Sequence, residues 1–417
     1  MMGGRPALQR RSKGGIRVAV AGFFLQFPGR GIGRYSSLVI EHLCRTDGID
    51  PLVLLAERED LGRIAVPSGM VPRTVLVPQP FRGLKRRLSP KAYEIAQRIH
   101  WEQIGVQLVR PRLHLDVLYS PYHTLPLFAP ARSIVTIHDL IPLTEPAYRG
   151  GALARAYFSL ASATARRAAV VITDSEFSRR EIVRLLGIPV ERVRAIPLGV
   201  EPVFTPMWDQ AAMDRARARL DLPGRYLLYV GGADVRKNIG VLLRAMALIR
   251  VRVAADPTGT AVGVPALVIA APPVGVATAQ RPDWRAEAHA LGLGLDAVRF
   301  VDYIAEEDLP AAYRGAEAFL FPSRAEGFGL TPLEALACGA PVLCAEASSL
   351  PEVVGDAALL LPPDDPGAWA EAMLRVCADG ELRGRLRAAG PARAAAFTWG
   401  RTAHAVHQTI LDVARLP

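Results

Sequence analysis

The sequence has few cysteines, and none stands in a spacing typical of metal or disulfide chemistry. Four occur among 417 residues, and no two of them form a C-x-x-C pair. This excludes a zinc site or a disulfide framework built on cysteine pairs. We expect reduced, buried thiols, the state usual in the cytoplasm. The four are Cys44, Cys338, Cys344 and Cys377.

Long apolar runs and short-period repeats are also missing. No run reaches the roughly 18 apolar residues that a membrane-spanning helix needs. Residues 1–27 imitate a secretion signal, because basic residues precede the mostly apolar stretch Ile16–Phe27. A signal peptide ends in a small-residue cleavage site, whereas this stretch leads into a glycine loop at residues 28–33. We therefore interpret Ile16–Gly22 as a buried first strand and expect a cytoplasmic protein.

The order of the remaining segments predicts two α/β domains. A chain of 417 residues is too long for one ordinary core, since domains average about 150 residues. Short apolar runs without polar alternation indicate strands covered on both faces. They alternate with helical stretches, which is typical of a doubly wound parallel sheet. The pattern restarts after a linking helix, Asp209–Leu220, for which Asp209 is the expected N-cap.

We predict two Rossmann-like domains that face each other across a cleft, residues 1–205 and 206–417. The last helical stretch, residues 402–416, can pack on either domain. Ligands of open α/β sheets bind at the carboxyl ends of the strands, where helix N-termini favour phosphate. The predicted strands are Ile16–Gly22, Pro51–Ala56, Thr74–Pro78, Val117–Ser120, Ile134–His138, Val170–Asp174, Val193–Pro197, Tyr226–Gly231, Ala266–Ala271, Val298–Asp302, Ala318–Pro322, Pro341–Cys344 and Ala358–Leu361.

The positive charge is concentrated in the first half. Residues 1–205 contain 29 Lys and Arg against 16 Asp and Glu, whereas residues 206–417 contain 21 against 24. The densest cluster is Arg82, Lys85, Arg86 and Arg87. It is either a solvated face of a basic protein or a peripheral contact with the inner face of a membrane. No nucleic-acid-binding motif is present.

The most informative segment is residues 321–339, FPSRAEGFGLTPLEALACG. A strand ends at its start, and glycines on both sides of Phe328 let the backbone approach a ligand. Thr331 is a suitable N-cap, and Thr331 with Glu334 fits a capping box, which would explain Glu334 without a ligand. Glu326 has no such structural explanation. An acid in a glycine loop that faces a cleft can accept hydrogen bonds from ligand hydroxyls.

Glu326 and Glu334 match the E-x7-E signature of glycosyltransferase family 4, retaining enzymes with the two-domain GT-B fold. The resemblance covers nearly the whole chain and follows the family's order of motifs. These motifs are the glycine loop 31–35, the histidine-bearing strand end 136–140, and residues 174–178, 197–200, 231–238 and 348–353. The resemblance implies a hexosyltransferase, similar to bacterial mannosyltransferases.

The resemblance also implies roles for individual residues of the second domain. Glu326 would contact donor-sugar hydroxyls beside the backbone of Phe328 and Gly329, and Glu334 would hold the ribose. The backbone N–H groups of Leu330 and Thr331 would meet the diphosphate. Arg236 and Lys237 would neutralise it, which agrees with the charge that a leaving nucleoside diphosphate gains in the transition state. The alternative for this pair is a solvated loop, which we disfavour because Gly231 and Gly232 follow a strand and Asn238 can cap a helix.

Three residues of the first domain complete the predicted site. Gly31 and Gly33 form either a tight turn or a backbone nest near the sugar-phosphate, with Arg34 adding charge or pointing to solvent. Ser36 stands where a dinucleotide fingerprint would have its third glycine. His138 ends a central strand, and the resemblance places it beside the transferred sugar. Asp139 can cap a turn, and His123 is a lesser candidate for the same wall.

The expected chemistry needs neither a metal nor a bound cofactor. No D-x-D motif for a diphosphate-bound cation is present, and Arg236 and Lys237 can supply the positive charge. The expected donor is GDP-mannose, with UDP-glucose or a related hexose donor as the alternative, and the acceptor is a surface polysaccharide or a lipid-linked glycan.

The motifs argue against three other functions. A nucleotide-sugar epimerase should lack the E-x7-E spacing, and a dinucleotide enzyme should have the complete glycine fingerprint. A non-catalytic partner subunit that only binds nucleotide sugars would have lost Glu326, Lys237 or His138.

Overall fold

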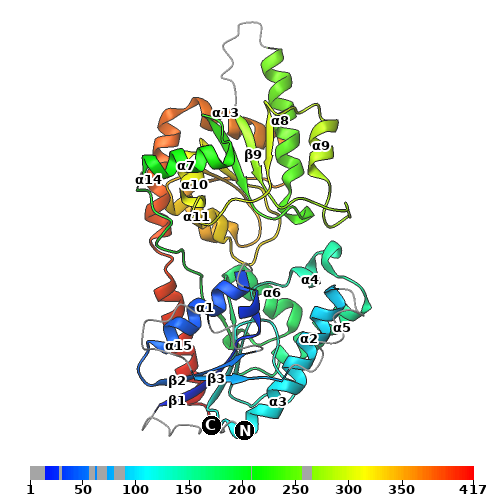
Figure 1. The fold of residues 1–417 in the computed structure, drawn as a ribbon, viewed down its shortest axis with the longest axis vertical. Helices are drawn as coiled ribbons and strands as arrows, with labels where there is room; N and C mark the ends of the chain where they lie inside the picture. The colour runs from blue at the N-terminus through cyan, green and yellow to red at the C-terminus, as the bar shows by residue number, and fades with distance from the viewer. Residues whose placement is uncertain are drawn as a thin grey trace, which may run out of the picture.

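Two parallel β-sheets, stacked along the longest axis of the molecule, form the framework (Figure 1). The computed structural model describes residues 15–27, 31–55, 62, 73–78, 90–207, 209–255 and 265–417. Within them, the first sheet has seven strands in the order β3-β2-β1-β4-β5-β6-β7. Its strands are β1 (Ile16–Ala21), β2 (Ile49–Leu55), β3 (Arg73–Leu76), β4 (Val117–Ser120), β5 (Ser133–Thr136), β6 (Val170–Thr173) and β7 (Val193–Ala195).

The second sheet has six strands in the order β10-β9-β8-β11-β12-β13, again within the described residues. Every pairing in both sheets is parallel, which matches the predicted doubly wound architecture. Its strands are β8 (Tyr226–Val230), β9 (Ala266–Ala270), β10 (Val298–Val301), β11 (Ala318–Phe321), β12 (Val342–Ala345) and β13 (Ala358–Leu361).

Helices cover the faces of both sheets, so the central strands are buried throughout. β4, β5, β6, β11 and β12 have no exposed residue, which explains their continuous apolar sequences. The helices are α1 (Gly31–Cys44), α2 (Pro90–His100), α3 (Val106–Val109), α4 (Ile141–Thr144), α5 (Ala152–Ala165), α6 (Glu176–Leu186), α7 (Gln210–Leu220), α8 (Ile239–Ala254), α9 (Trp284–Ala290), α10 (Leu309–Gly315), α11 (Leu330–Ala337), α12 (Leu350–Val354), α13 (Pro366–Ala378), α14 (Gly380–Ala394) and α15 (Trp399–Ala414).

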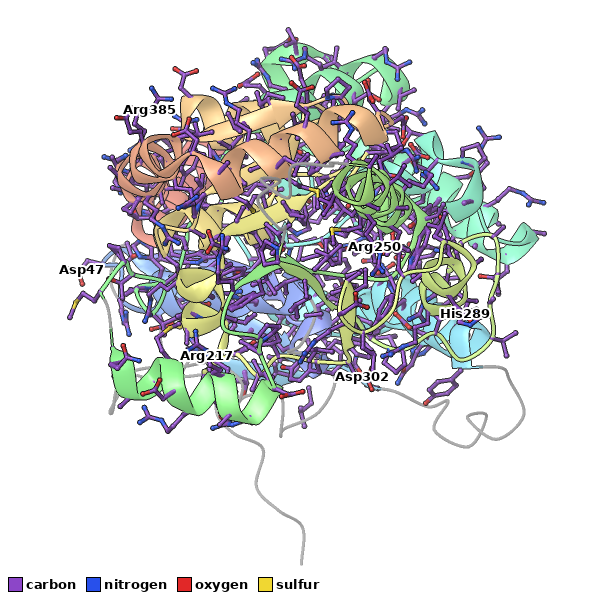
Figure 2. The ribbon with its side chains drawn as sticks, turned by 90° about the horizontal axis from the view of Figure 1, so that it is seen from above. Asp47, Arg217, Arg250, His289, Asp302 and Arg385 are labelled. Atoms are coloured by element: carbon purple, nitrogen blue, oxygen red, sulfur yellow. The ribbon has the colours of Figure 1, made fainter. Side chains whose placement is uncertain are left out.

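Charged side chains at the rim of the molecule point away from these layers. Seen from above, Asp47 and Arg385 lie at the edge of the outline, whereas Arg250 lies well inside it (Figure 2). All three side chains are exposed, as are those of Arg217, His289 and Asp302. Among the helices that the structure describes, none is both long and apolar enough to cross a bilayer. The predicted basic cluster at residues 82–87 lies outside the described residues.

The last helix returns to the first sheet. α15 follows the second sheet in sequence, yet it packs on α1 and on strands of the first sheet (Figure 1). Near the C-terminal end of α15, Asp412 pairs with Arg194 of β7 at 2.7 Å. Near the start of α15, the hydroxyl of Thr402 donates to the carbonyl of Pro197 at 2.7 Å. The chain therefore passes between the two sheets twice, once near residue 200 and once near residue 398.

The two passages touch each other. Val200 and Thr398 form an isolated parallel bridge. A Cβ atom on Gly199 would lie 2.0 Å from the backbone nitrogen of Trp399, so this close approach requires glycine. The N-cap predicted at Asp209, just after the first passage, is formed: its side chain accepts a 3.0 Å hydrogen bond from the Ala212 N–H.

Candidate active site

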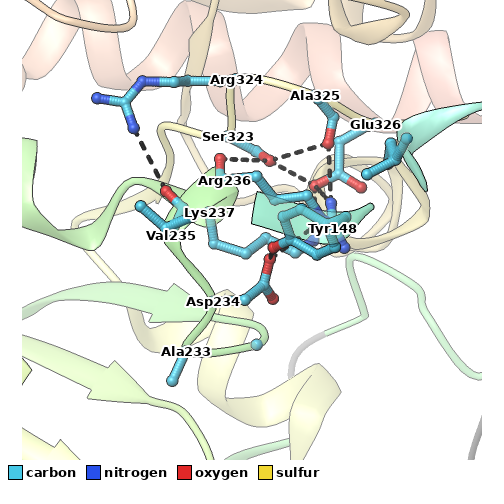
Figure 3. Close-up of polar contacts among 12 residues, drawn as sticks. Tyr148, Ala233, Asp234, Val235, Arg236, Lys237, Ser323, Arg324, Ala325 and Glu326 are labelled. Atoms are coloured by element: carbon cyan, nitrogen blue, oxygen red, sulfur yellow. Dashed lines mark hydrogen bonds and ion pairs between the residues drawn. The ribbon is translucent and has the colours of Figure 1, made fainter. Parts of the chain in front are cut away.

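The carboxylate of Glu326 lies between two cations (Figure 3). Its Oε1 atom is 2.6 Å from Nζ of Lys237 and 3.1 Å from Nη1 of Arg236, and it accepts a 2.6 Å hydrogen bond from the hydroxyl of Ser323. Burial by itself favours the neutral acid, but the charges of Lys237 and Arg236 outweigh it and lower the pKa of Glu326. Glu326 is therefore an anion at neutral pH.

Both cations come from a short turn, η8 (Val235–Lys237), which follows strand β8. The side chain of Lys237 is 11% exposed and that of Arg236 is 19% exposed, so this turn is not a solvated loop. Arg236 also donates to the carbonyl of Ala325 at 2.8 Å and pairs with Asp234 at 3.1 Å. The turn is thereby attached to the loop between β11 and α11, residues 322–329, which carries Glu326 and is the glycine loop of the second domain.

Two helix caps predicted from the sequence do not form. α11 begins two residues earlier than a Thr331 N-cap would require, after Gly329, whose φ of 122° strongly favours glycine. Thr331 is consequently the second helical residue, and no side chain caps the helix. Asn238 precedes α8 but makes no side-chain cap either. It has the left-handed backbone conformation, with φ of 57°, in place of the extended one typical of N-caps, and its amide N–H donates to the carbonyl of Pro363 at 2.6 Å.

Glu334 is bound to partners far away in the sequence rather than to its own helix terminus. Its Oε1 atom accepts a 3.0 Å hydrogen bond from Arg34, and Oε2 accepts one of 3.4 Å from the hydroxyl of Tyr313. Arg34, on α1, also pairs with Glu201. Burial raises the pKa of Glu334 to about 7, although the charge of Arg34 opposes this. The predicted capping box is therefore wrong, and Glu334 joins the two domains.

The other predicted residues of this segment differ in exposure. Phe328 is buried, and its ring packs edge-on against Phe397 with centroids 5.9 Å apart. Its carbonyl accepts a 2.6 Å hydrogen bond from the hydroxyl of Ser349. Leu330 and Thr331 are partly exposed at the first turn of α11. Their position leaves early helix N–H groups available to a ligand.

The first glycine motif lies in a helix rather than in a loop. Gly31 and Gly33 belong to the first turn of α1. A Cβ atom on Gly33 would lie 2.4 Å from the carbonyl oxygen of Phe27, whereas one on Gly31 would meet nothing within 4 Å. Gly33 is thus required for packing on the preceding segment. The loop predicted at this position is wrong.

His138 follows strand β5 and is held on both sides of its ring. Its Nδ1 atom is 2.7 Å from Oδ2 of Asp174, and Nε2 is 3.2 Å from the carbonyl oxygen of Pro121. Burial lowers the pKa of His138, but the charge and hydrogen bond of Asp174 outweigh it, so the pKa is raised overall. In the sequence, Asp174 stands only as the first residue of the motif at 174–178, and no role could be predicted for it.

The two other candidates on this wall, Asp139 and His123, make contacts that a structural role explains. Asp139 accepts a 3.0 Å hydrogen bond from the N–H of Ile141, so it does cap a turn. Burial lowers the pKa of His123 to about 4, and its ring packs against Phe158 with centroids 6.1 Å apart. His123 is therefore a neutral packing residue at neutral pH.

The two domains meet beside Glu326. The hydroxyls of Ser175 and Ser178 donate to the carbonyl of Gly327 at 2.7 and 3.2 Å. A Cβ atom on Gly327 would lie 2.2 Å from the carbonyl oxygen of His138, so the loop after β5 touches the glycine loop. A cavity of about 150 Å³ adjoins this contact, and residues of both domains, including Asp139 and Glu326, line it.

Comparisons with known proteins agree with this architecture. A family model described as Glycosyltransferase Family 4 matches residues 29–204, and one described as Glycosyl transferases group 1 matches residues 212–393. The chain is 29% identical to O-antigen chain mannosyltransferase B of Escherichia coli over 377 residues, which cover 90% of this chain and 94% of that protein. It is 26% identical to the serotype-specific mannosyltransferase WbdA of Escherichia coli, over 93% of this chain but only 47% of the relative.

The fold has solved counterparts. Sucrose-phosphate synthase from Thermosynechococcus elongatus matches with a TM-score of 0.72 and 22% sequence identity, over 95% of this chain and 99% of the other. The two family models follow each other along the chain, and each contains most of the strands of one sheet. The chain therefore belongs to glycosyltransferase family 4, and it is a glycosyltransferase with the GT-B fold.

Proposed function

We propose that this enzyme transfers a hexose from a nucleotide-diphosphate sugar to a hydroxyl group of a glycan or lipid-linked acceptor, with retention of anomeric configuration. The observation that carries the proposal is the contact of Glu326 with Lys237 and Arg236. This contact supports the proposal, because a carboxylate that can accept hydrogen bonds from sugar hydroxyls lies beside two cations that suit a diphosphate.

Each part of the bound donor would lie against residues of suitable charge. Its diphosphate would lie against Lys237 and Arg236 and the N–H groups of Leu330 and Thr331, and its sugar against Glu326. Glu334 would accept hydrogen bonds from the ribose. Since Arg34 now contacts Glu334 at 3.0 Å, this guanidinium would share or leave the carboxylate when the nucleotide binds.

Glu326 is poorly suited to act as a nucleophile, because two cations and a hydroxyl occupy Oε1. We therefore propose attack by the acceptor on the face from which the phosphate departs. The bond between the anomeric carbon and the phosphate oxygen breaks, the bond to the acceptor oxygen forms, and the acceptor proton moves to the leaving phosphate. The protein contributes orientation and electrostatic stabilisation, and domain closure limits hydrolysis by water.

GDP-mannose is the proposed donor. The resemblance to an O-antigen chain mannosyltransferase along nearly the full length of both proteins supports mannose. Arg236 and Lys237 would replace a divalent metal at the diphosphate, so the reaction would be metal-independent. A bound cofactor is not needed, since the nucleotide sugar is a substrate.

A panel of donors tests the proposal. Thermal unfolding is measured with UDP-, GDP-, ADP- and TDP-sugars, and turnover is then measured with the donor that stabilises the protein. The anomeric configuration of the product is read from its one-bond carbon–hydrogen coupling. Stabilisation by UDP-glucose alone would replace mannose with glucose, an inverted product would exclude the same-face mechanism, and stabilisation by none would contradict donor binding.

A further inference from the structure

The ring of His138 has an acceptor at each nitrogen. The carbonyl oxygen of Pro121, 3.2 Å from Nε2, can only accept, so Nε2 must carry a hydrogen. The carboxylate oxygen of Asp174, 2.7 Å from Nδ1, calls for a hydrogen there as well. A neutral imidazole has only one N–H. An imidazolium paired with a carboxylate satisfies both contacts, and so would a neutral imidazole that accepts a hydrogen bond from a protonated Asp174. Burial raises the pKa of Asp174, although the charge of His138 opposes this. We assign the proton to the ring, because the ordinary pKa of histidine, about 6.5, is well above that of aspartate, about 3.9.

Asp174 is placed for this contact alone. It follows strand β6 and is 3% exposed, and its neighbour Ser175, not Asp174, caps helix α6. Its Oδ1 atom has no hydrogen-bond partner among the described residues. A buried carboxylate is unfavourable unless a charge compensates it, and His138 is the partner that the structure provides.

The groups around the ring leave this pair intact. Tyr35, on α1, meets the ring edge-on with centroids 4.8 Å apart, and its hydroxyl contacts that of Tyr119, on β4, at 2.8 Å. Burial raises the pKa of both tyrosines, so they stay neutral. His123 is neutral as well, because burial lowers its pKa to about 4. Asp139 is the other acid beside the ring, and its charge acts in the same direction as that of Asp174.

We propose that Asp174 is a positioning residue: it holds His138 as a fixed imidazolium, so the ring nitrogens take no part in proton transfer and the backbone at His138 is held against the glycine loop. The inference rests on the proposed function, because the family resemblance behind that function implies that the transferred sugar lies beside His138. The ring anchors the loop after β5, and the carbonyl of His138 lies where a Cβ on Gly327 would be 2.2 Å away. Without the ion pair, the ring would lose one of its two anchors.

The test is the protonation state of His138 in the wild type and in Asp174→Asn. The full chain is labelled with ¹⁵N-histidine, and His138→Gln assigns the signals. We expect wild-type His138 to remain an imidazolium between about pH 6 and pH 8, the range in which an ordinary histidine loses its proton. In Asp174→Asn the folded-state pKa falls, so the ring should titrate within that range. A wild-type ring with one protonated nitrogen, or with a midpoint near the ordinary value of about 6.5, would overturn the proposal.

The pH profile of kcat provides the second readout. Because Asp174→Asn loses the imidazolium as the pH rises, its kcat relative to wild type should fall about tenfold between pH 6 and pH 8. A loss of equal size at every pH would indicate a merely structural role and would also overturn the proposal. Thr173→Val is the matched control, since its hydroxyl is buried without a partner, and it should titrate like wild type. The NMR result does not depend on turnover, so failure of the proposed function would be seen separately.

Discussion

Replacing Glu326 with glutamine should tighten nucleoside diphosphate binding while it abolishes most of the turnover. In the ligand-free protein, Glu326 and a diphosphate compete for the same two cations, Lys237 at 2.6 Å and Arg236 at 3.1 Å. With an effective dielectric constant of about 20, these contacts amount to about 6 and about 5 kcal/mol before desolvation is subtracted. Glutamine keeps the shape of the side chain and removes the competing charge.

The net effect is much smaller than these attractions, because desolvation offsets most of them. Removing one partner of a buried ion pair destabilises by about 3–5 kcal/mol. We expect about 2 kcal/mol here, since all three side chains are between 11% and 19% exposed. In Glu326→Gln, a bound diphosphate would restore the charge balance at Lys237 and Arg236. The gain of about 2 kcal/mol in binding free energy corresponds to about 30-fold tighter binding. Turnover should fall about 10²–10³-fold, the usual loss when one electrostatic contact to a transition state is removed.

Titration calorimetry with GDP and UDP measures the affinity, and steady-state assays with the nucleotide sugar measure turnover. Glu371→Gln, an exposed carboxylate on α13, is the control for a change in net charge and should match wild type in both. Glu326→Gln should also unfold at a lower temperature than wild type without ligand and gain more from added nucleotide. Weaker nucleotide binding together with full turnover would refute the assignment of Glu326.

The remaining predictions concern the same cleft. Lys237→Ala should lower kcat about 10²-fold, because a cation beside the leaving group is removed; a steady-state assay that gave wild-type kcat would be inconsistent with its role. Glu334→Ala should mainly raise the Kd for nucleotide in calorimetry, whereas a lower Tm with unchanged Kd would assign Glu334 a purely structural role. The pKa of Glu334, raised to about 7, implies that folding becomes less favourable as the pH rises through that value, since the folded chain must give up a proton that the unfolded chain has already lost. The difference in unfolding free energy between wild type and Glu334→Gln should therefore change by about 1 kcal/mol between pH 6 and pH 8. Removal of divalent metals with EDTA should leave the rate unchanged, and a loss restored by Mg²⁺ or Mn²⁺ would contradict the proposed metal independence.

Much of the architecture could be predicted because buried parallel strands have a strong local signature. All thirteen predicted strands are present, with no end displaced by more than two residues. The helix caps were less predictable. Thr331 and Glu334 fit a cap pattern locally, but Glu334 finds a stronger partner in Arg34, which is 300 residues away in the sequence. Local patterns carry no information about such a partner.

The site was predicted in part for the same reason. The carboxylates, Arg236 and Lys237 stand in short motifs that can be read from the sequence. The contact between His138 and Asp174 joins the ends of two neighbouring strands, and it depends on strand order, which the sequence does not state. The return of α15 to the first sheet was left open for a similar reason. Its apolar face fits either domain until the surface that accepts it is known.

The paired passages near Gly199 and Trp399 limit how the enzyme can open. One flexible connection would act as a ball joint and let the halves rotate freely. Two connections that touch would favour a hinge motion, in which the halves move apart about one axis and resist rotation about the others. Each closure would then return the loop that carries Glu326 to the same contact with the first domain. Donor and acceptor would therefore meet in the same relative position in every catalytic cycle. The same arrangement means that one cut in the chain cannot release either half as a complete unit.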